Sequence, residues 1–269
     1  MEKIGVSLHV GTLLNTPETE AQAALQKEYG GAAALLAYLR REGVCSIEVR
    51  NVREHMPVAQ SVAAIRAVHE AGLGTSVHIA FEERTGREYA ARVRTMIDEA
   101  LRGQERVVFT LHPLKNDGET AARYADWAAA LHEYDGRCRL ALENMRVLKP
   151  DAGHNRIARV AQNIRSAPEA ARGVCWDMGH YAYNIVTLGL PAETCPVRDI
   201  LGQVIHTHIH SLHHPELDTH FPLQRTNEPV KSYLAALRAA GYQGIYNIEL
   251  EPERYIRVMS PRAGMEQTV

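Results

Sequence analysis

Residues 140–144 of the chain read Leu-Ala-Leu-Glu-Asn, an apolar run that ends in a carboxylate and an amide. An apolar run of this length is typical of a strand that is covered on both faces, as the strands of parallel sheets are. A carboxylate directly after such a strand is costly to bury unless it has a partner. The stretch therefore predicts a buried parallel strand with Glu143 at its carboxyl end, next to a group of opposite charge.

Apolar runs of the same kind recur along the whole chain at regular intervals. They are Ile4–Leu8, Val44–Val49, Gly74–Ile79, Arg106–Leu111, Arg139–Leu142, Val174–Trp176, Val204–Ile209 and Ile245–Leu250. Between them lie Ala-rich segments with the spacing of amphipathic helices. Examples are Glu18–Arg41, Val58–Ala71, Glu88–Arg102, Glu119–Tyr134 and Pro229–Ala240. Gly43, Gly72 and Gly241 follow such segments, at the position where a glycine often ends a helix.

Strands that alternate with helices predict an α/β protein with a parallel sheet, and eight such units predict a (β/α)8 TIM barrel. A doubly wound open sheet is the alternative. We find no linker or shift in composition, so residues 1–269 are predicted to form a single TIM-barrel domain, with a C-terminal tail over about residues 255–269. The longest irregular stretch is His210 to Glu228, and long loops after barrel strands usually carry function.

The composition narrows the class of protein. Of the 269 residues, 45% are hydrophobic and 23% charged, which is the balance of a soluble globular protein. The formal net charge of −2 gives no overall basic field that would attract nucleic acid. No stretch reaches 18 apolar residues, so we expect no membrane segment. The four cysteines lack CxxC spacing, which favours a reducing, cytoplasmic location.

Ionisable residues end nearly every predicted strand. They are His9, Glu48, His78, His112, Glu143, Asp177, His208 and Glu249. From Glu48 onward they are 30, 34, 31, 34, 31 and 41 residues apart, about the length of one strand–helix unit, so they are predicted to lie together at the carboxyl rim of the barrel. Acids and imidazoles crowded there need a positive partner, and divalent metal ions prefer these ligands.

Three further motifs place ionisable side chains near this rim. In Asp177-Met178-Gly179-His180 the acid and the imidazole are one turn apart, so both can face one cavity. In Asp218-Thr219-His220, alternate residues of an extended loop project the same way. The histidines 206, 208 and 210 share one strand face; they cannot all be ligands, and the position favours His208.

With these motifs, the sequence resembles the xylose-isomerase-like barrel superfamily from about Ile4 to Glu253, and within it the endonuclease IV-like (AP endonuclease family 2) and sugar phosphate isomerase/epimerase branch. The matching elements are His78, His112-Pro113, Leu142-Glu143-Asn144, Asp177-Met178-Gly179-His180, His206-Thr207-His208, Asp218-Thr219-His220 and Ile248-Glu249. Each element alone is a weak signal, but nine ligand positions in the order of the family are a strong one.

The resemblance implies about two to three divalent ions per chain, with zinc preferred and manganese or iron as alternatives. The first ion would be held by His78, His112 and Glu143. The second would share Glu143 and add Asp177, His208 and Glu249. The third would be held by His180, Asp218 and His220. Among these residues, we expect Glu143, Glu249 and His180 to be catalytic.

The chain departs from endonuclease IV where that family recognises DNA. The glycine-rich stretch after strand one reads Leu8-His9-Val10-Gly11-Thr12, and the glycine after the strand-four His-Pro is Leu114. The Gly-x-Gly after the loop histidine is replaced by Phe221-Pro222-Leu223-Gln224. Duplex DNA is therefore not expected as a substrate. The sequence does not determine the oligomeric state.

Two reactions fit the predicted site. Hydrolysis of a phosphoester of a sugar-like compound would use the His180, Asp218 and His220 trio, and we favour it narrowly. Isomerisation or epimerisation of a sugar or sugar phosphate needs only Glu143, Asp177, His208 and Glu249, and is the alternative. A metal-binding barrel without catalysis is a third reading. The substrate is expected to be small and phosphorylated or polyhydroxylated. Arg50, Lys115 and Arg146 lie near strand ends and would meet a phosphate, unless they are solvated loop cations.

Overall fold

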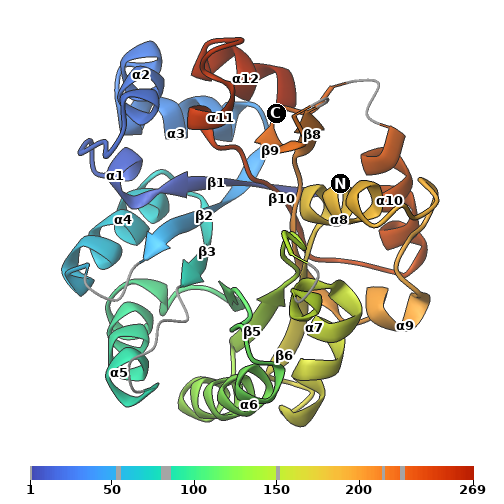
Figure 1. Ribbon diagram of the computed structural model, residues 1–269. Helices are drawn as coiled ribbons and strands as arrows, with labels where there is room; N and C mark the ends of the chain where they lie inside the picture. Colours follow the sequence, from blue (N-terminus) through green and yellow to red (C-terminus); the bar gives the residue numbers. More distant parts are fainter. Residues whose placement is uncertain (1, 53–55, 80–85, 150–151, 214–215, 225–227) are drawn as a thin grey trace.

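The predicted eight-stranded parallel barrel is confirmed by a computed structural model, which describes residues 2–52, 56–79, 86–149, 152–213, 216–224 and 228–269. The strands stand at the centre of the molecule, with helices around them (Figure 1). They are β1 (Lys3–His9), β2 (Val44–Val52), β3 (Gly74–Ile79), β4 (Val107–Leu111), β5 (Cys138–Glu143), β6 (Arg172–Asp177), β7 (Val204–His208) and β10 (Ile245–Ile248). Each pairs in parallel with its neighbours in the order β10-β1-β2-β3-β4-β5-β6-β7.

The barrel closes between β7 and β10 through a short seam. Ile209 pairs with Ile248 in an isolated parallel bridge, in which the Ile209 amide donates to the Asn247 carbonyl at 2.8 Å and the Glu249 amide donates to the Ile209 carbonyl at 3.0 Å. The hydroxyl of Thr207 fills the next position: it donates to the Ile245 carbonyl and accepts from the Asn247 amide, both at 3.1 Å. With one bridged residue pair, this seam is shorter than the ladders between the other described strands.

Helices cover the outside of the barrel. They are α1 (Val10–Leu13), α2 (Glu20–Tyr29), α3 (Ala32–Arg41), α4 (Val58–Glu70), α5 (Gly86–Met96), α6 (Asp117–Tyr134), α7 (Ile157–Asn163), α8 (Met178–Thr187), α9 (Arg198–Leu201), α10 (Glu228–Ala239), α11 (Pro252–Tyr255) and α12 (Pro261–Thr268). Short helical turns lie at η1 (Ile97–Leu101), η2 (Gly153–Asn155) and η3 (Ile164–Ser166). In the predicted C-terminal tail, α12 lies beside α2, where the Arg262 amide donates to Glu28 Oε2 at 2.7 Å.

Two expectations about local structure need correction. The segment Glu18–Arg41 is two helices, because Gly30 and Gly31 between them have φ of 84° and 107°, a left-handed backbone that ends a helix. The stretch His210–Glu228 is not wholly irregular, since β8 (Ser211–His213) and β9 (Asp218–Phe221) pair as an antiparallel hairpin. The three predicted cap glycines, Gly43, Gly72 and Gly241, do have positive φ.

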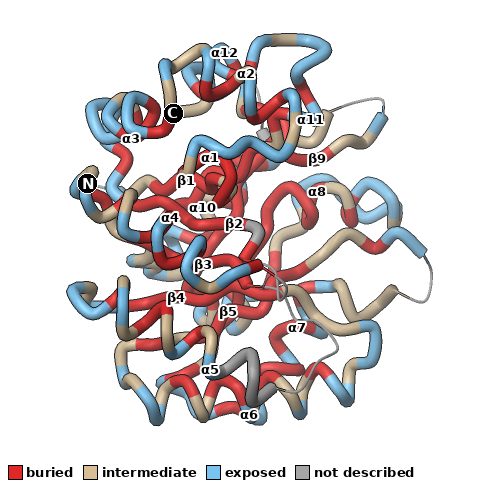
Figure 2. The backbone as a smooth tube through the Cα atoms, turned by 90° about the vertical axis from the view of Figure 1, so that its left-hand side faces the viewer, coloured by how far each residue is buried: buried red, intermediate tan, exposed pale blue. Residues whose placement is uncertain are grey.

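The core has two parts, and together they position the rim. The large cluster fills the space between the strands and the helices, so the strands are buried along their length (Figure 2). A small cluster inside the barrel consists of Val108, Ala141, Cys175 and Ile205. Because side chains alternate along a strand, the residues two positions after Ala141 and Cys175 also face inward. Those residues are Glu143 and Asp177, which therefore stand one layer above an apolar floor.

Candidate metal centre

Glu143, at the end of β5, is the centre of the site. Its side chain is 1% exposed, and four imidazoles surround its carboxylate. Oε2 lies 3.2 Å from His78 Nε2, 3.2 Å from His208 Nδ1 and 3.5 Å from His112 Nε2, while Oε1 lies 3.4 Å from His180 Nδ1. These histidines come from the units of β3, β4, β6 and β7, on both sides of β5, so the convergence of strand ends at one rim is what brings them together.

A second carboxylate approaches the same group from the opposite side of the seam. Glu249, directly after β10, places Oε2 3.1 Å from His208 Nδ1. Ligand atoms of Glu143, Asp177, His208 and Glu249 all lie within 4.8 Å of one another, and all four residues are buried. We call these residues the four-donor group. His78, Glu143 and His208 form an overlapping set, as do Glu48, His206 and His208 deeper in the barrel.

The donors of this group fit a divalent cation. Within the described residues, both ring nitrogens of His208 and Oε2 of Glu249 are buried and make no hydrogen bond, although they lie close to other polar atoms. Buried polar atoms of this kind are normally satisfied. One imidazole nitrogen and three carboxylates within a few ångströms are a ligand set for zinc, manganese or iron. The group therefore has the chemistry and the unmet polar atoms of a metal site.

The electrostatics of the buried acids point the same way. Burial alone would raise the pKa of Glu143, but His208 and His112 beside it hold that pKa well below its ordinary value. For Glu249, burial is likewise outweighed by Arg50 and His208, which lower its pKa. Burial would lower the pKa of His208, but Cys175 and Glu249 raise it well above the ordinary value. The acids around His208 thus favour a positive charge beside them, and a bound cation would supply one.

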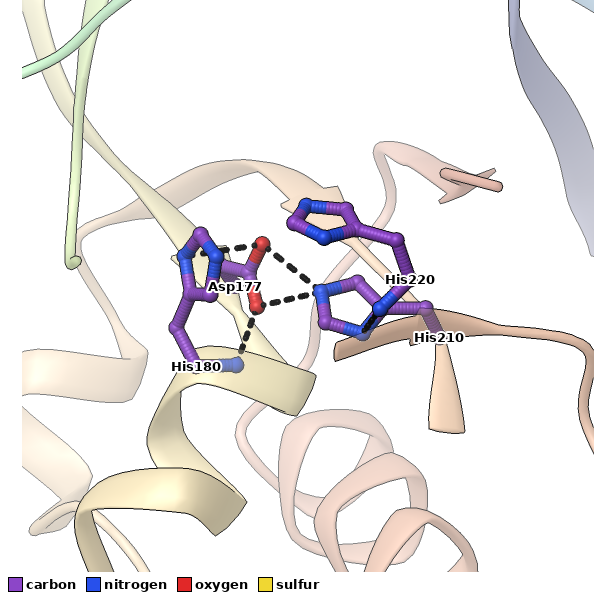
Figure 3. Close-up of side chains that lie close together, drawn as sticks. All are labelled: Asp177, His180, His210 and His220. Atoms are coloured by element: carbon purple, nitrogen blue, oxygen red, sulfur yellow. Dashed lines mark hydrogen bonds and ion pairs between the residues drawn. The ribbon is translucent and has the colours of Figure 1, made fainter. Parts of the chain in front are cut away.

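Asp177 belongs to two groups at once. Its carboxylate is part of the four-donor group and also of a second set that we call the histidine group: Asp177, His180, His210 and His220 (Figure 3). Asp177 caps the N-terminus of α8, where Oδ1 accepts from the His180 amide at 2.6 Å. Oδ2 lies 3.2 Å from His180 Nδ1 and 3.1 Å from His210 Nε2. Asp177 is therefore placed to link two neighbouring cation positions.

His180 has one ring nitrogen surrounded by acceptors. Its Nδ1 lies 3.2 Å from the Asn144 carbonyl, 3.2 Å from Asp177 Oδ2 and 3.4 Å from Glu143 Oε1. Three oxygens around one nitrogen favour the tautomer with the proton on Nδ1, which leaves Nε2 as the nitrogen free to bind a ligand. His220 faces it from the hairpin, with ring centroids 5.1 Å apart.

The sequence placed most of the site residues together, and the structure brings seven of them into the donor groups: His78, Glu143, Asp177, His180, His208, His220 and Glu249. His112 lies at the edge, with its side chain 45% exposed and its ring 4.7 Å from that of His78. Asp218, by contrast, is 42% exposed and pairs with Arg254 at 3.8 Å. Within the described residues, Asp218 is not part of any of these groups.

The predicted ligand set lacks four residues of the site: Glu48, His206, His210 and Arg50. The strand position favours His208 over His210 as a ligand, yet His210 is fully buried against Asp177. Its signal was present, because the alternation of histidines 206, 208 and 210 puts all three on one face. Arg50 was weighed as a solvated cation or a phosphate contact, but it is buried and pairs with Glu249 at 2.7 Å and Glu251 at 3.5 Å. Of the other two cations, Arg146 lies over the ring of Tyr183 at 5.7 Å, and Lys115 is exposed.

Comparison with known proteins agrees with this geometry. The model of the xylose isomerase-like TIM barrel family matches residues 36–268, which confirms the resemblance read from the motifs. A search of curated protein sequences gave no match. Among the described residues, no helix is long and apolar enough to cross a membrane.

Two solved structures with the same fold are the following. A sugar phosphate isomerase/epimerase from Parabacteroides distasonis is 15% identical, with a TM-score of 0.62, and the match covers 99% of this chain and 92% of that one. The IolI protein with a bound zinc atom is 14% identical, with a TM-score of 0.58, and the match covers 97% of this chain and 94% of that one. At such low identity, these likenesses establish the fold, and the family points to an enzyme.

Proposed function

Because the chain belongs to the xylose isomerase-like TIM barrel family, we propose that it is a metal-dependent isomerase or epimerase of a small polyhydroxylated carbonyl compound. The observation that carries the proposal is the four-donor group, in which Glu143, Asp177, His208 and Glu249 offer ligand atoms within 4.8 Å of one another. A divalent cation held there would polarise adjacent hydroxyl and carbonyl oxygens of a substrate. The zinc atom named in the IolI structure supports this reading.

The two glutamates are placed to move the proton. Glu143 and Glu249 approach the same nitrogen, His208 Nδ1, at 3.2 and 3.1 Å, from strands on either side of β6 and β7. In the proposed reaction one carboxylate takes the proton from the carbon that bears a hydroxyl beside the carbonyl, which leaves a carboxylic acid and an enediolate. In an isomerisation the proton then returns to the neighbouring carbon, and the hydroxyl proton passes to the former carbonyl oxygen. In an epimerisation a proton is returned to the other face of the same carbon. Because Arg50 helps to keep the Glu249 carboxylate ionised, Glu249 starts as a base.

The charges around the site favour a substrate without a phosphate. The guanidinium of Arg50 is already paired with two carboxylates, those of Glu249 and Glu251. A phosphate would therefore meet the buried acids of the rim without a free cation in Arg50 to balance it. A polyol with a keto or aldehyde group carries no such charge, and we propose this class in preference to a sugar phosphate.

The test is proton exchange at carbon. The protein, loaded in turn with Zn²⁺, Mn²⁺ or Co²⁺, is incubated in D₂O with a panel of ketoses, aldoses and keto-polyols, and the loss of C–H signal next to the carbonyl is followed by ¹H NMR. A substrate that exchanges should do so more slowly in Glu249→Gln by a factor on the order of 10²–10⁴. The matched control is Glu253→Gln, an acid four residues further on, in α11, whose Oε1 accepts from Gln22 of α2. Absence of exchange with every sugar and metal would reject the proposal.

Phosphoester hydrolysis is the second candidate, because Asp177 is shared by two donor groups and two cations side by side suit that reaction. The expectation from the sequence favoured hydrolysis narrowly on the His180, Asp218 and His220 trio. The position of Asp218, paired with Arg254 outside the donor groups, removes part of that support and moves our preference to isomerisation. Release of phosphate from monoesters or diesters, without C–H exchange in sugars, would reverse the order.

A further inference from the structure

His210 lies at the rim with both of its ring nitrogens hydrogen-bonded to the protein. It follows β7 by two residues and is fully buried between Asp177 and the backbone of β9. Figure 3 shows its ring lying between the carboxylate of Asp177 and the main chain of His220. The rings of His210 and His220 stack with centroids 4.2 Å apart.

The contacts at Nδ1 determine where the proton of His210 resides. The backbone N–H of His220 donates to Nδ1 at 2.8 Å, and an N–H can only donate to a nitrogen that carries a lone pair. The Ser211 carbonyl is also near Nδ1, but farther away at 3.3 Å. The ring proton is therefore assigned to Nε2. This nitrogen faces Asp177, with Oδ1 at 3.0 Å and Oδ2 at 3.1 Å, so it donates to the carboxylate.

The surroundings are shaped to keep the ring in this place. A Cβ on Gly179 would lie 1.9 Å from His210 Cε1 and 2.0 Å from its Nδ1, so only glycine at position 179 leaves room for the imidazole. His220, whose amide fixes the tautomer, has φ of 65°, a left-handed backbone that is uncommon outside glycine. Gly179 and the backbone of His220 thus both hold the imidazole of His210 in place.

We infer that His210 is a positioning residue that holds the carboxylate of Asp177 through Nε2–H, and that it is not itself a metal ligand. The inference rests on the proposed metal centre, but it concerns how that centre is held and makes no assumption about the substrate. Donors of this kind orient the carboxylates that bind a metal, and their loss typically weakens metal binding about 10–100-fold. Gly179 is then part of the same device, because it makes space for the ring.

The first test reads the tautomer directly in metal-free protein. Long-range ¹H–¹⁵N correlation spectra of histidine-labelled protein, with His210 assigned by comparison with His210→Gln, should show a protonated Nε2 and an unprotonated Nδ1. The pattern should persist when Zn²⁺ is added. A proton on Nδ1 in the metal-free protein, or loss of the Nε2 proton on adding Zn²⁺, would overturn the inference. This measurement requires no activity, so it stands whether or not any sugar is turned over.

The second test measures metal binding with Co²⁺, whose visible absorption reports the ligand geometry. His210→Ala should bind the same number of ions at saturation as the unaltered chain, with an affinity about 10–100-fold lower. His210→Gln should recover most of the affinity, because its amide N–H can reach Asp177. If His210 is a ligand, the alanine variant will lose one ion even at saturation and glutamine will not restore it. An unchanged affinity in the alanine variant would equally refute a positioning role.

A variant pair tests the role of the glycine. Gly179→Ala should reproduce the loss of affinity of His210→Ala, since the added methyl group displaces the ring. The matched control is Gly103→Ala, because a Cβ there meets nothing within 4 Å. Circular dichroism and melting temperature verify that each variant is folded before metal is added. Wild-type affinity in folded Gly179→Ala would contradict the packing argument, and the same loss in Gly103→Ala would show that the effect is not specific.

Discussion

Asn144 and Asp177 are joined by two reciprocal hydrogen bonds of 2.9 Å each: Asn144 Nδ2 donates to the Asp177 carbonyl, and the Asp177 amide donates to Asn144 Oδ1. Both residues are 0% exposed. One side chain thus replaces the ladder that would continue between β5 and β6, at the level where Glu143 and Asp177 leave their strands. Through these two hydrogen bonds, Asn144 fixes the position of Asp177 relative to the neighbouring residue Glu143.

This relationship predicts the effect of removing the amide. Asn144→Ala would leave a buried donor and a buried acceptor of Asp177 without partners, and each such group costs about 1–3 kcal/mol. We expect the free energy of unfolding of metal-free protein to fall by about 2–6 kcal/mol in urea titrations. The control is Gln162→Ala, an exposed side chain that should change it by no more than about 0.5 kcal/mol. Equal stability of the two variants would contradict the argument.

Glu143 should be the most damaging single position for metal content. Its carboxylate contacts imidazoles on both of its oxygens, so it can serve two cation positions. Elemental analysis of protein purified without chelator is expected to find about two or more divalent ions per chain. Glu143→Ala should lower that content more than His112→Ala, because the His112 side chain is 45% exposed at the edge of the site. Fewer than about one ion in the unaltered protein, with no gain on adding zinc or manganese, would refute the multinuclear centre.

The pair Asp218 and His220 separates the two candidate reactions. If the chain is an isomerase that uses the four-donor group, Asp218→Ala together with His220→Ala should keep that group occupied and leave turnover within about tenfold. If a hydrolytic ion depends on these residues, the double change should remove it and reduce the rate on the order of a thousandfold. Metal content and rate are measured before and after the change on the best substrate. We expect the first result; loss of both metal and turnover would favour hydrolysis.

Cleavage of DNA should be poor. The net charge is −2, and Leu114 and Phe221–Gln224 stand where endonuclease IV has the glycines of its recognition loops. A protein that binds duplex DNA normally presents a basic face to the phosphates. We expect little incision of a duplex with an abasic site at any divalent metal tested, measured by gel electrophoresis against a sample of known endonuclease. Efficient metal-dependent incision would restore DNA as a substrate.

Much of the fold was readable from the sequence because each strand is a short apolar run that ends in an ionisable residue. That pattern gave the eight strands and, through the spacing from Glu48 to Glu249, their common rim. The break at Gly30 and Gly31 was not anticipated, because the Ala-rich composition on both sides continues the helical pattern. The hairpin of β8 and β9 was missed for a different reason: its strands are short and polar, and they pair only with each other.

The site was less predictable than the fold, since spacing places a backbone position but not a side chain. His210 and His208 have the same spacing signal, and only the room left by Gly179 and the amide of His220 distinguish their roles. The alternating motif predicts that Asp218 faces the rim, but Asp218 is the half-exposed first residue of β9, and its side chain pairs with Arg254. Arg50 lies two residues after Glu48, and nothing in the sequence indicates that it is buried and paired with Glu249.

Because the seam between β7 and β10 is short, metal binding is expected to affect how stably the barrel stays closed. His208 is the last residue of β7, and Glu249 directly follows β10. An ion bound by both residues would therefore cross-link the two strands that close the barrel. A metal ion that binds only the closed barrel would stabilise the closed barrel by about 2.7 kcal/mol when the free metal concentration is about a hundred times Kd. Amide hydrogens of Ile209 and Glu249 should therefore exchange with solvent much more slowly when metal is present, while those between β4 and β5 should change little. The metal ion would then also stabilise the closure of the barrel, and unfolding after loss of the metal would begin between β7 and β10.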